Sequence, residues 1–463
     1  MNTPTNLLTK NQRLLFPLLL VTACILVYYP ILDNDFMYKW DDQWQVLNDY
    51  TYIWSWETII GIFSDFFHGQ YSPINQLIYT LLYKLFGVTP IPFHLASLLL
   101  HIANVLLVFG LIRSIIAFRM PEQKPLAKQV AFCATLLFAI HPLQVEAVAW
   151  ISASKILVCS LFYLLAMRSY YLYVATGKVR YYYLVFPAFL LAFGGKEQAV
   201  TLPLALLWID LAMGRNMKDG LIWQEKISFI VVSIFFSFIT FSASHAMDEI
   251  ALKNLETYPL IQRIPMSFYS ISEYLTKTLI PIKLYYIYPF PMKIGDPMPY
   301  WFWIYPLLTG VLAYSFWPLL KRPPVYLGLL FFLIQLSLVI HIIPFPRIFI
   351  VADRYCYLAC TGVLFILVWF GILYTQKIPS FKKPLSGLFL VYCLYLGCYA
   401  HLRTKAWEND ATLKSEITNL AKQDRPHDQK DADRSSSRHA STAISFEKSA
   451  IIIDTTEIRQ SNK

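Results

Sequence analysis

The stretch "LLFPLLLVTACILVYYPIL", from Leu14 to Leu32, decides the fold class of this chain, because it contains no charged residue. A helix of roughly 20 apolar residues is long enough to cross the hydrocarbon core of a bilayer. The run is too long for the apolar region of a cleavable signal peptide and lacks a small-residue cleavage site. We therefore expect a signal anchor, with Lys10 and Arg13 holding the N-terminus inside.

Comparable apolar runs recur along the chain. It has 463 residues, of which 57% are hydrophobic and 15% charged, whereas soluble domains carry about 25% charged residues. We predict an all-α polytopic membrane protein with about eleven transmembrane helices. The net charge of +10 then reflects Lys and Arg on the cytoplasmic side, and no nucleic-acid partner is expected. The expected spans are 14–32, 94–118, 128–142, 156–174, 182–195, 198–213, 227–245, 302–319, 325–343, 355–374 and 385–401.

The charged residues between these spans test the topology. With the N-terminus inside, each connection predicted to be cytosolic carries two or three cations, including 119–127, 214–226 and 375–384. Membrane proteins concentrate Lys and Arg on the cytoplasmic side. The pattern places two large loops, 33–93 and 246–300, on the outer side.

One further apolar segment, 264–282, could be a twelfth span. If it crossed the membrane, "KRPP" at 321–324 would lie outside and the charge pattern would fail beyond it. We therefore interpret the segment as a re-entrant or interfacial element. Glu273 and Lys277 are four residues apart and should pair on one helix face.

The outer loop 33–93 contains two amphipathic segments, 54–67 and 73–87, that are rich in Trp, Tyr and Phe. Such residues favour the headgroup region, so we expect helices lying in the interface plane. Residues 1–413 form the predicted membrane domain. Residues 414–463 are predicted to be a polar, disordered tail on the outer side.

Two adjacent carboxylates follow the first span closely. Asp41 and Asp42 lie in "MYKWDDQWQV", residues 37–46, between Trp40 and Trp44. A partly desolvated carboxylate acquires a shifted pKa and can serve as a base. The alternative is a solvated loop or an ordinary helix N-cap.

Three more polar clusters lie at the outer ends of spans in this topology. They occur in "HPLQVEAVAWISASK" (141–155), "GGKEQ" (194–198) and "VADRYCYL" (351–358). Each alone could be a membrane-edge charge or a loop ion pair worth little. Together they predict one external site whose carboxylates activate an acceptor and whose cations hold a phosphate. The candidate residues are His141, Glu146, Lys155, Lys196, Glu197, Asp353 and Arg354.

Several strings resemble one family in the same order along the chain. They include "DDQWQVLND", "LFAIHPLQVEAVAWISASK", "GGKEQAVTLPLALLWIDL", "ADRYCYL" and "RTKAWENDATL". From about Tyr29 to Leu413, the chain resembles the transmembrane and tetratricopeptide-repeat O-mannosyltransferases of the GT-C class. The resemblance implies a GT-C-like helix bundle, a polyprenyl-phosphate sugar donor that often carries mannose, and a protein, lipid or glycan acceptor on the external side.

The resemblance also implies roles for the candidate residues. Asp41 or Asp42 matches the catalytic aspartate of the first outer loop. The cations Lys155, Lys196 and Arg354 would bind the donor phosphate, and the supporting residues would be His141, Glu146, Glu197 and Asp353. The chain departs from the family at two places, with Ser72 where members read Arg and Ser154-Lys155 where they read Gly-Arg. The helical repeats that follow "WEND" in the family are absent from this sequence.

The resulting hypothesis is a membrane glycosyltransferase with an external active site. A divalent metal such as Mg²⁺ or Mn²⁺ could bridge carboxylates and phosphate, but the sequence does not require one. Two alternatives stay open: a transporter or flippase of lipid-linked sugars, and an inactive truncated relative. Short loops favour a bacterial inner membrane, and the endoplasmic reticulum membrane is the expectation for a eukaryotic chain.

Overall fold

The computed structural model describes residues 10–66, 70–245, 258–343 and 349–423. The chain divides into two units, Met1–Lys414 and Ser415–Lys463. The described residues of the second unit, 415–423, are the end of helix α20 (Asp410–Gln423). Helix α20 therefore extends into the segment predicted as a tail, and residues 424–463 lie outside the described residues.

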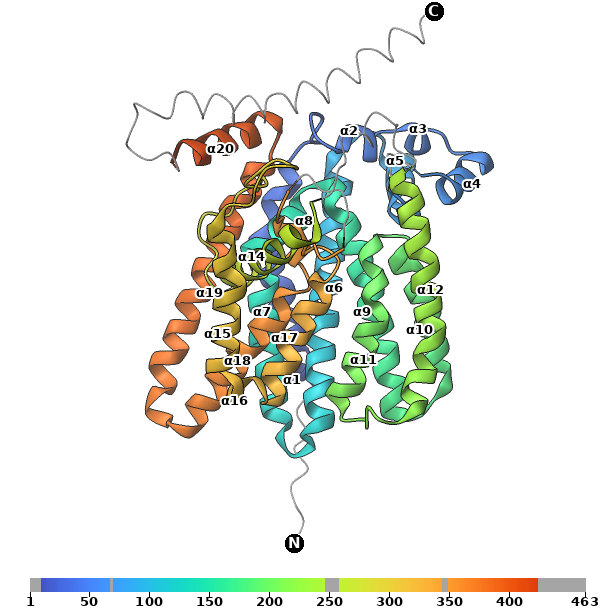
Figure 1. The fold of residues 1–463 in the computed structure, drawn as a ribbon. Helices are drawn as coiled ribbons and strands as arrows, with labels where there is room; N and C mark the ends of the chain where they lie inside the picture. The colour runs from blue at the N-terminus through green and yellow to red at the C-terminus, as the bar shows by residue number, and fades with distance from the viewer. Residues whose placement is uncertain (1–9, 67–69, 246–257, 344–348, 424–463) are drawn as a thin grey trace, which may run out of the picture. The chain divides into compact units, whose positions relative to one another are not determined.

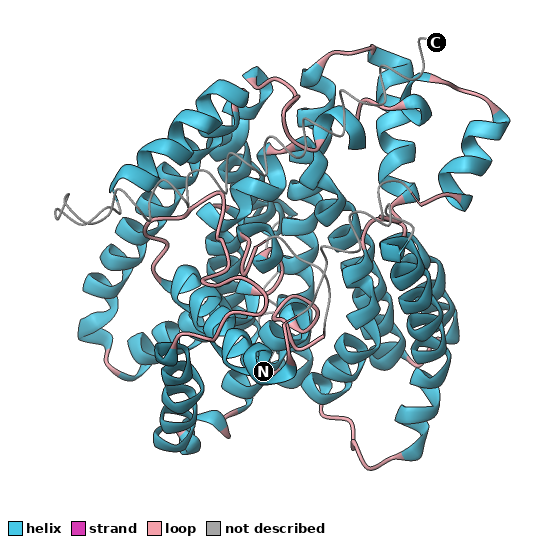
Figure 2. Ribbon diagram, turned by 45° about the horizontal axis from the view of Figure 1, so that its top comes forward, coloured by secondary structure: helices cyan, strands magenta, loops and turns pink. Residues whose placement is uncertain are grey.

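The regular secondary structure of the described residues is helical and includes no strand (Figure 2); Pro289 and Phe349 form an isolated bridge. A helix occupies each of the eleven expected spans. These helices are α1 (Lys10–Tyr28), α6 (Pro90–Arg119), α7 (Lys124–Ala139), α9 (Lys155–Thr176), α10 (Val179–Phe193), α11 (Leu202–Met213), α12 (Gly220–His245), α15 (Ile304–Ser315), α17 (Pro323–Leu336), α18 (Cys360–Lys377) and α19 (Lys382–Thr404).

Six helical segments within the described residues are long and apolar enough to cross a membrane, as the prediction of an all-α membrane protein requires. They are Leu14–Asp33, Pro90–Arg119, Ile151–Thr176, Gly220–Ser242, Cys360–Lys377 and Pro379–Trp407. A seventh would be the pair Pro121–Ala139 and Pro142–Ala149, which is bent by 54°. Helices α11 and α15 have only 12 residues each, about 18 Å of helix against a core of about 30 Å. The count of eleven spans therefore stays a prediction.

The helices of the bundle separate two sets of connections. The connections predicted to be cytosolic, within 119–127, 214–226 and 375–384, lie at one end, at the bottom of Figure 1. The short helices α2 (Asp42–Gln45), α3 (Asp49–Tyr52), α4 (Trp56–Ser64) and α5 (Pro73–Phe86) lie at the other end. This arrangement agrees with the alternation of the charges, while the side on which each end lies stays a prediction.

The two amphipathic segments of the outer loop form helices, as predicted. Ser55 caps α4 by accepting a hydrogen bond from the Thr58 N–H at 3.1 Å, and α5 begins at Pro73, whose fixed φ suits a first helical position. Their place in the membrane interface stays a prediction. The doubtful segment 264–282 lies in helix α14 (Leu260–Leu279), which is not among the candidate spans. The expected contact between Lys277 and Glu273 is present in α14.

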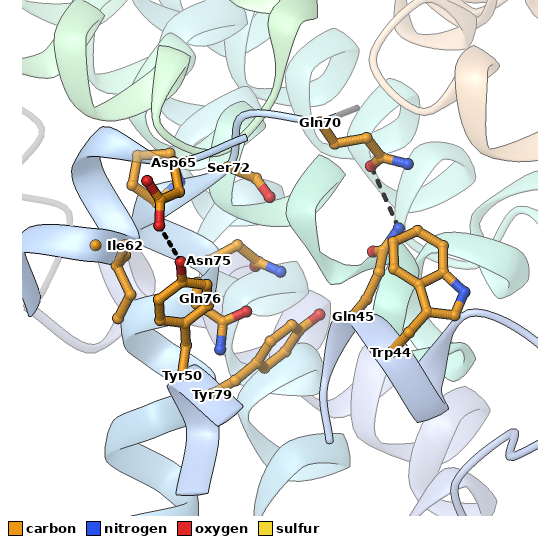
Figure 3. A pocket seen from close by; sticks show the side chains of 12 residues that line it. Trp44, Gln45, Tyr50, Ile62, Asp65, Gln70, Ser72, Asn75, Gln76 and Tyr79 are labelled. Atoms are coloured by element: carbon orange, nitrogen blue, oxygen red, sulfur yellow. Dashed lines mark hydrogen bonds between the residues drawn. The ribbon is translucent and has the colours of Figure 1, made fainter. Parts of the chain in front are cut away.

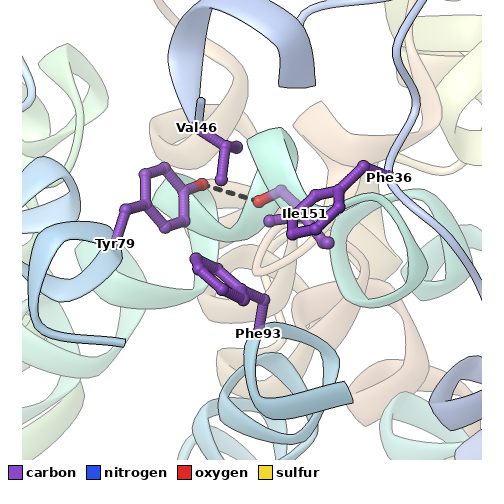
Figure 4. Packing of buried hydrophobic residues seen from close by; sticks show 5 residues of the cluster. All are labelled: Phe36, Val46, Tyr79, Phe93 and Ile151. Atoms are coloured by element: carbon purple, nitrogen blue, oxygen red, sulfur yellow. Dashed lines mark hydrogen bonds between the residues drawn. The ribbon is translucent and has the colours of Figure 1, made fainter. Parts of the chain in front are cut away.

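An apolar cluster fixes the outer loop onto the bundle (Figure 4). Phe36 and Val46 from the start of the loop, Tyr79 from α5, Phe93 from α6 and Ile151 are all buried in it. The Tyr79 hydroxyl donates to the carbonyl of Ile151 at 2.7 Å, so the ring packs in the cluster and its polar tip is satisfied. The segment between Phe36 and Val46, which carries both aspartates, is therefore held at both ends.

Candidate functional site

Asp42 is a buried residue that joins the outer loop to the bundle. Its side chain is fully buried and accepts hydrogen bonds from the N–H groups of Met37 and Ser152, both at 2.9 Å. The Ser152 hydroxyl also donates to it. Burial raises the pKa of Asp42 to about 6 against these hydrogen bonds, with a small further contribution from Asp41. These contacts fix the Asp42 carboxylate against the backbone of Met37 and against Ser152.

Asp41 is in a different environment. It is half-buried, and no group of the described residues hydrogen-bonds to its carboxylate. Its negative charge interacts with the cations Lys155 and Arg354. Asp41 precedes α2 directly, and its carbonyl accepts from the Gln45 N–H at 2.7 Å, so the backbone of Asp41 is fixed at the start of this helix.

Lys155 begins helix α9 and is held by neutral groups. Its ammonium group donates to the amide oxygens of Gln45 at 2.9 Å and Gln70 at 2.5 Å. Only 7% of Lys155 is exposed, and no carboxylate of the described residues lies within ion-pair distance of it. An ammonium group removed from water without a direct counter-charge favours a bound anion.

Arg354 lies beside Glu146, which belongs to a different one of the predicted polar clusters. The guanidinium contacts one carboxylate oxygen of Glu146, and the backbone N–H of Arg354 donates to the other at 2.9 Å. Burial alone would lower the pKa of Arg354, but the charge and hydrogen bond of Glu146, together with Tyr355 and Asp41, raise it. The guanidinium also lies over the rings of Trp150 at 5.4 Å and Tyr355 at 5.0 Å, which fixes its orientation.

Lys196 completes the set of cations. Its ammonium group lies 3.9 Å from a carboxylate oxygen of Glu197 and 5.6 Å from the centre of the Tyr355 ring. Tyr355 therefore lies against both Arg354 and Lys196. The charges of Lys196, Glu197 and Arg354 all act on Lys155, so residues from two distant parts of the sequence lie within electrostatic range of Lys155.

Two predicted residues belong to other contacts. His141 is buried; its Nε2 lies 3.0 Å from the carbonyl of Thr278, and its Nδ1 accepts from the Leu143 N–H at 3.2 Å. Asp353 is buried as well, and it accepts from the Tyr288 hydroxyl at 2.8 Å and from Arg403 at 3.1 Å. Burial raises the pKa of Asp353 to about 6 against the opposing charge of Arg403. The contacts of both residues hold α14 and α19 at this end of the bundle.

Sequence reasoning assigned no role to several residues of this region. Trp407 stacks on Trp150 with ring centres 5.4 Å apart, and Trp40 contacts both rings at their edges. Trp40 directly precedes Asp41 in the sequence. The signal for Trp407 was its place in the motif "RTKAWENDATL". Gln45 and Gln70, which accept the hydrogen bonds of Lys155, lie in no distinguishing sequence pattern.

A second charged cluster lies near the opposite end of the bundle and neutralises itself. Arg215 contacts Asp210 at 2.9 Å and Glu225 at 2.7 Å, and Lys226 contacts Asp210 at 2.6 Å. Tyr170 donates to both carboxylates. Two cations and two carboxylates satisfy one another, so this cluster gives no reason to expect a ligand. Within the described ranges, no three His, Cys, Asp or Glu side chains gather in a way that could hold a metal ion.

Comparison with known proteins identifies relatives of the chain. No family model matches it, and no solved structure matches it. The protein O-mannosyl-transferase TMTC4 of Mus musculus is 35% identical over 108 residues, which are 22% of this chain and 15% of the relative. Tmtc1 of Drosophila melanogaster is 32% identical over 154 residues, 33% of this chain and 17% of the relative.

A third relative extends the match. The protein O-mannosyl-transferase F38B6.6 of Caenorhabditis elegans is 25% identical over 224 residues, 46% of this chain and 30% of the relative. The chain thus spans less than a third of the length of each of these three curated relatives. Over the matched residues it is similar to the TMTC protein O-mannosyl-transferases, in agreement with the resemblance of its sequence motifs.

Proposed function

We propose that this chain is a membrane glycosyltransferase that moves a hexosyl group, mannose first among the candidates, from a polyprenyl phosphate to a hydroxyl acceptor. The reaction takes place at the end of the bundle that carries the outer loop, on the external side of the membrane. A protein, lipid or glycan could supply the hydroxyl. The similarity to protein O-mannosyl-transferases supports the reaction class.

One observation carries the proposal. The carboxylate of Asp41 is not hydrogen-bonded by any described residue, and it lies in the field of Lys155 and Arg354. A base must be available to the proton it removes, and a departing phosphate needs cations close by. The interaction of Asp41 with both cations, one of them more than 300 residues away in the sequence, supports a shared role in one reaction.

Each group has a defined part in the reaction. The acceptor oxygen attacks the anomeric carbon while the bond from that carbon to the phosphate oxygen breaks, which inverts the anomeric centre. Asp41 takes the proton of the acceptor hydroxyl. The lipid phosphate leaves with the bonding electrons, and the positive charges of Lys155, Lys196 and Arg354 stabilise it. Asp42 holds the short helix that positions Asp41.

The decisive experiment compares two aspartates of the same loop. Purified protein in lipid nanodiscs receives a labelled polyprenyl-phosphate mannose and a mixture of peptide and glycan acceptors. Asp41→Asn keeps the shape of the side chain and removes the base, so transfer should fall by about 10²–10⁴. Asp49→Asn changes an exposed aspartate at the start of α3 and should leave transfer at the level of the unmodified protein.

Donor binding should survive in Asp41→Asn, because the three cations are unchanged. Transfer within a few-fold of the unmodified protein in Asp41→Asn would show that Asp41 is not the base. Movement of the labelled lipid across the membrane without transfer to any acceptor would instead favour a flippase.

A further inference from the structure

A pocket lies between the short helices α2, α3, α4 and α5 of the outer loop (Figure 3). Four carboxamides line it, from Gln45, Gln70, Asn75 and Gln76. The Gln45 amide nitrogen donates to Gln70 Oε1 at 3.2 Å, so the two amides form one side of the pocket. A wall of neutral groups that can each donate and accept suits a neutral ligand with several hydroxyls.

The side-chain amides of Asn75 and Gln70 have N–H groups that are available to hydrogen-bond a ligand. Asn75 is only 2% exposed, its Oδ1 accepts from the Ser154 hydroxyl at 3.4 Å, and its amide nitrogen points into the pocket in Figure 3. Apart from an interaction with Tyr79, no described group engages that nitrogen, which carries two N–H groups. The Gln70 amide nitrogen likewise donates to no group among the described residues.

The aromatic rings and the charge of the pocket lining limit the class of ligand that the pocket can bind. Trp44, Tyr50 and Tyr79 line the same pocket, and their rings can pack against the C–H faces of a pyranose. The charged group of the lining is the carboxylate of Asp65, which accepts from the Tyr50 hydroxyl. A carboxylate repels a phosphate, so the pocket suits an uncharged ring rather than the anion itself.

The pocket shares two residues with the cationic centre. Gln45 and Gln70 line the pocket and also accept the hydrogen bonds of Lys155. A ligand in the pocket therefore lies next to the ammonium group of Lys155. In a sugar phosphate, the ring and the anion are separated by a single bridging oxygen, which matches this adjacency.

Resting on the proposed function, we infer that the pocket binds the hexosyl ring of the sugar donor while Lys155 and its neighbouring cations bind the phosphate. Asn75 and Gln70 donate to ring hydroxyls, and the aromatic rings pack against the ring. The pocket would then determine which sugar the protein transfers.

Soluble ligands can test binding at the pocket and binding at the cations around Lys155 separately. We would measure binding of inorganic phosphate, mannose 1-phosphate and methyl α-mannoside to the full chain in nanodiscs by calorimetry. The unmodified protein should bind mannose 1-phosphate about tenfold more tightly than phosphate, since one or two good hydrogen bonds account for such a ratio. Equal affinities for the two anions would overturn the inference.

Pocket variants should abolish the tenfold preference for mannose 1-phosphate over inorganic phosphate without changing the affinity for phosphate. Asn75→Leu removes the amide N–H donor. Ser72→Leu fills the pocket with a larger side chain; Ser72 is half-buried and its hydroxyl makes no cap hydrogen bond. The second variant therefore tests the inference if the first misfolds. Gln43→Met is the matched control, because Gln43 is exposed on α2 and does not line the pocket. Retention of the tenfold ratio in Ser72→Leu would refute the assignment.

The outcomes also separate the pocket from the proposed function. Failure of the unmodified protein to bind phosphate would count against the cationic donor site. Methyl α-mannoside would then decide the pocket alone: binding that Ser72→Leu abolishes supports it, and the absence of binding rejects it.

Discussion

Asp41 and Asp42 are neighbours in sequence, but their carboxylates are in different environments because only that of Asp42 is fully buried. Asp42 accepts from three donors and is fully buried. Asp41 receives no hydrogen bond from any described residue and lies near two cations. The physical difference is desolvation, which is why we propose Asp41, and not Asp42, as the base.

Asp42→Asn should destabilise the protein even though the two side chains have the same shape. The three donors around Asp42 all point at oxygen, and an asparagine must turn its NH₂ group toward at least one of them. Loss of a hydrogen bond to a charged, buried group costs about 1.5–3 kcal/mol. The midpoint of thermal unfolding in detergent should fall clearly, whereas Asp49→Asn should leave it unchanged.

The stability difference between the unmodified protein and Asp42→Asn should narrow as the pH rises. Burial raises the pKa of Asp42 from 3.8 to about 6, so the folded protein keeps a proton that the unfolded chain has already lost. That contribution is complete below about pH 4 and is lost as the pH rises through about 6; its size is on the order of 3 kcal/mol. Asp353 titrates in both proteins and cancels from the difference. A difference that widens over this range would contradict the assignment.

A double variant can separate the ion pair of Arg354 with Glu146 from its proposed contact with the donor phosphate. Arg354→Ala leaves Glu146 buried without its partner, which costs about 3–5 kcal/mol of stability, and it also removes a cation from the phosphate. In Arg354→Ala/Glu146→Gln the unpaired charge is gone, so stability should largely return. Affinity for the donor lipid should nevertheless stay at least about tenfold weaker. Recovery of both properties would show that Arg354 serves Glu146 alone.

At the scale of helices, α17 and α18 approach closely because two glycines meet. A Cβ atom on Gly362 would lie 2.2 Å from the carbonyl oxygen of Gly328, and one on Gly328 would lie 2.6 Å from the carbonyl of Gly362. Small residues allow such backbone contacts between helices in membranes, where packing rather than the hydrophobic effect drives association.

Gly362→Ala should therefore separate α17 from α18 and lower stability by about 1–3 kcal/mol, the usual cost of overpacking. The control is Gly371→Ala on the same helix, where the new methyl group would meet Leu385 at 4.0 Å, an ordinary contact. Since alanine favours a helix over glycine by about 1 kcal/mol, the control should be neutral or stabilising. Equal thermal midpoints for the two variants would contradict the close contact.

At the scale of the whole molecule, the topology can be tested by reporter fusions. Fusions in 119–127, 214–226 and 375–384 should report the cytosol, and a fusion in 33–93 should report the external side, because Lys and Arg are retained inside. A fusion after residue 463 should be external if the number of spans is odd. A cytosolic C-terminus would mean an even number of spans and would require a revised fold.

The membrane class, the helical segments and the two amphipathic helices of the outer loop followed from the order of residues alone. Hydrophobic length and the placement of Lys and Arg are properties of local sequence, so they can be read without a structure. The candidate charges were also identified, because ionisable residues at the ends of apolar spans are rare and conspicuous. The sequence could not establish which of the apolar helices cross the membrane, since helices as short as α11 can end inside a bundle.

Only the tertiary structure decided which charges face one another. The sequence grouped His141 with Glu146 and Asp353 with Arg354, yet His141 and Asp353 turn to Thr278 and to Arg403, while Glu146 and Arg354 form the pair. Adjacent residues on an irregular segment point in different directions, and their partners come from segments up to hundreds of residues away. The contacts of Gln45 and Gln70 with Lys155 could not be predicted for the same reason, because only folding brings these neutral amides next to the cation.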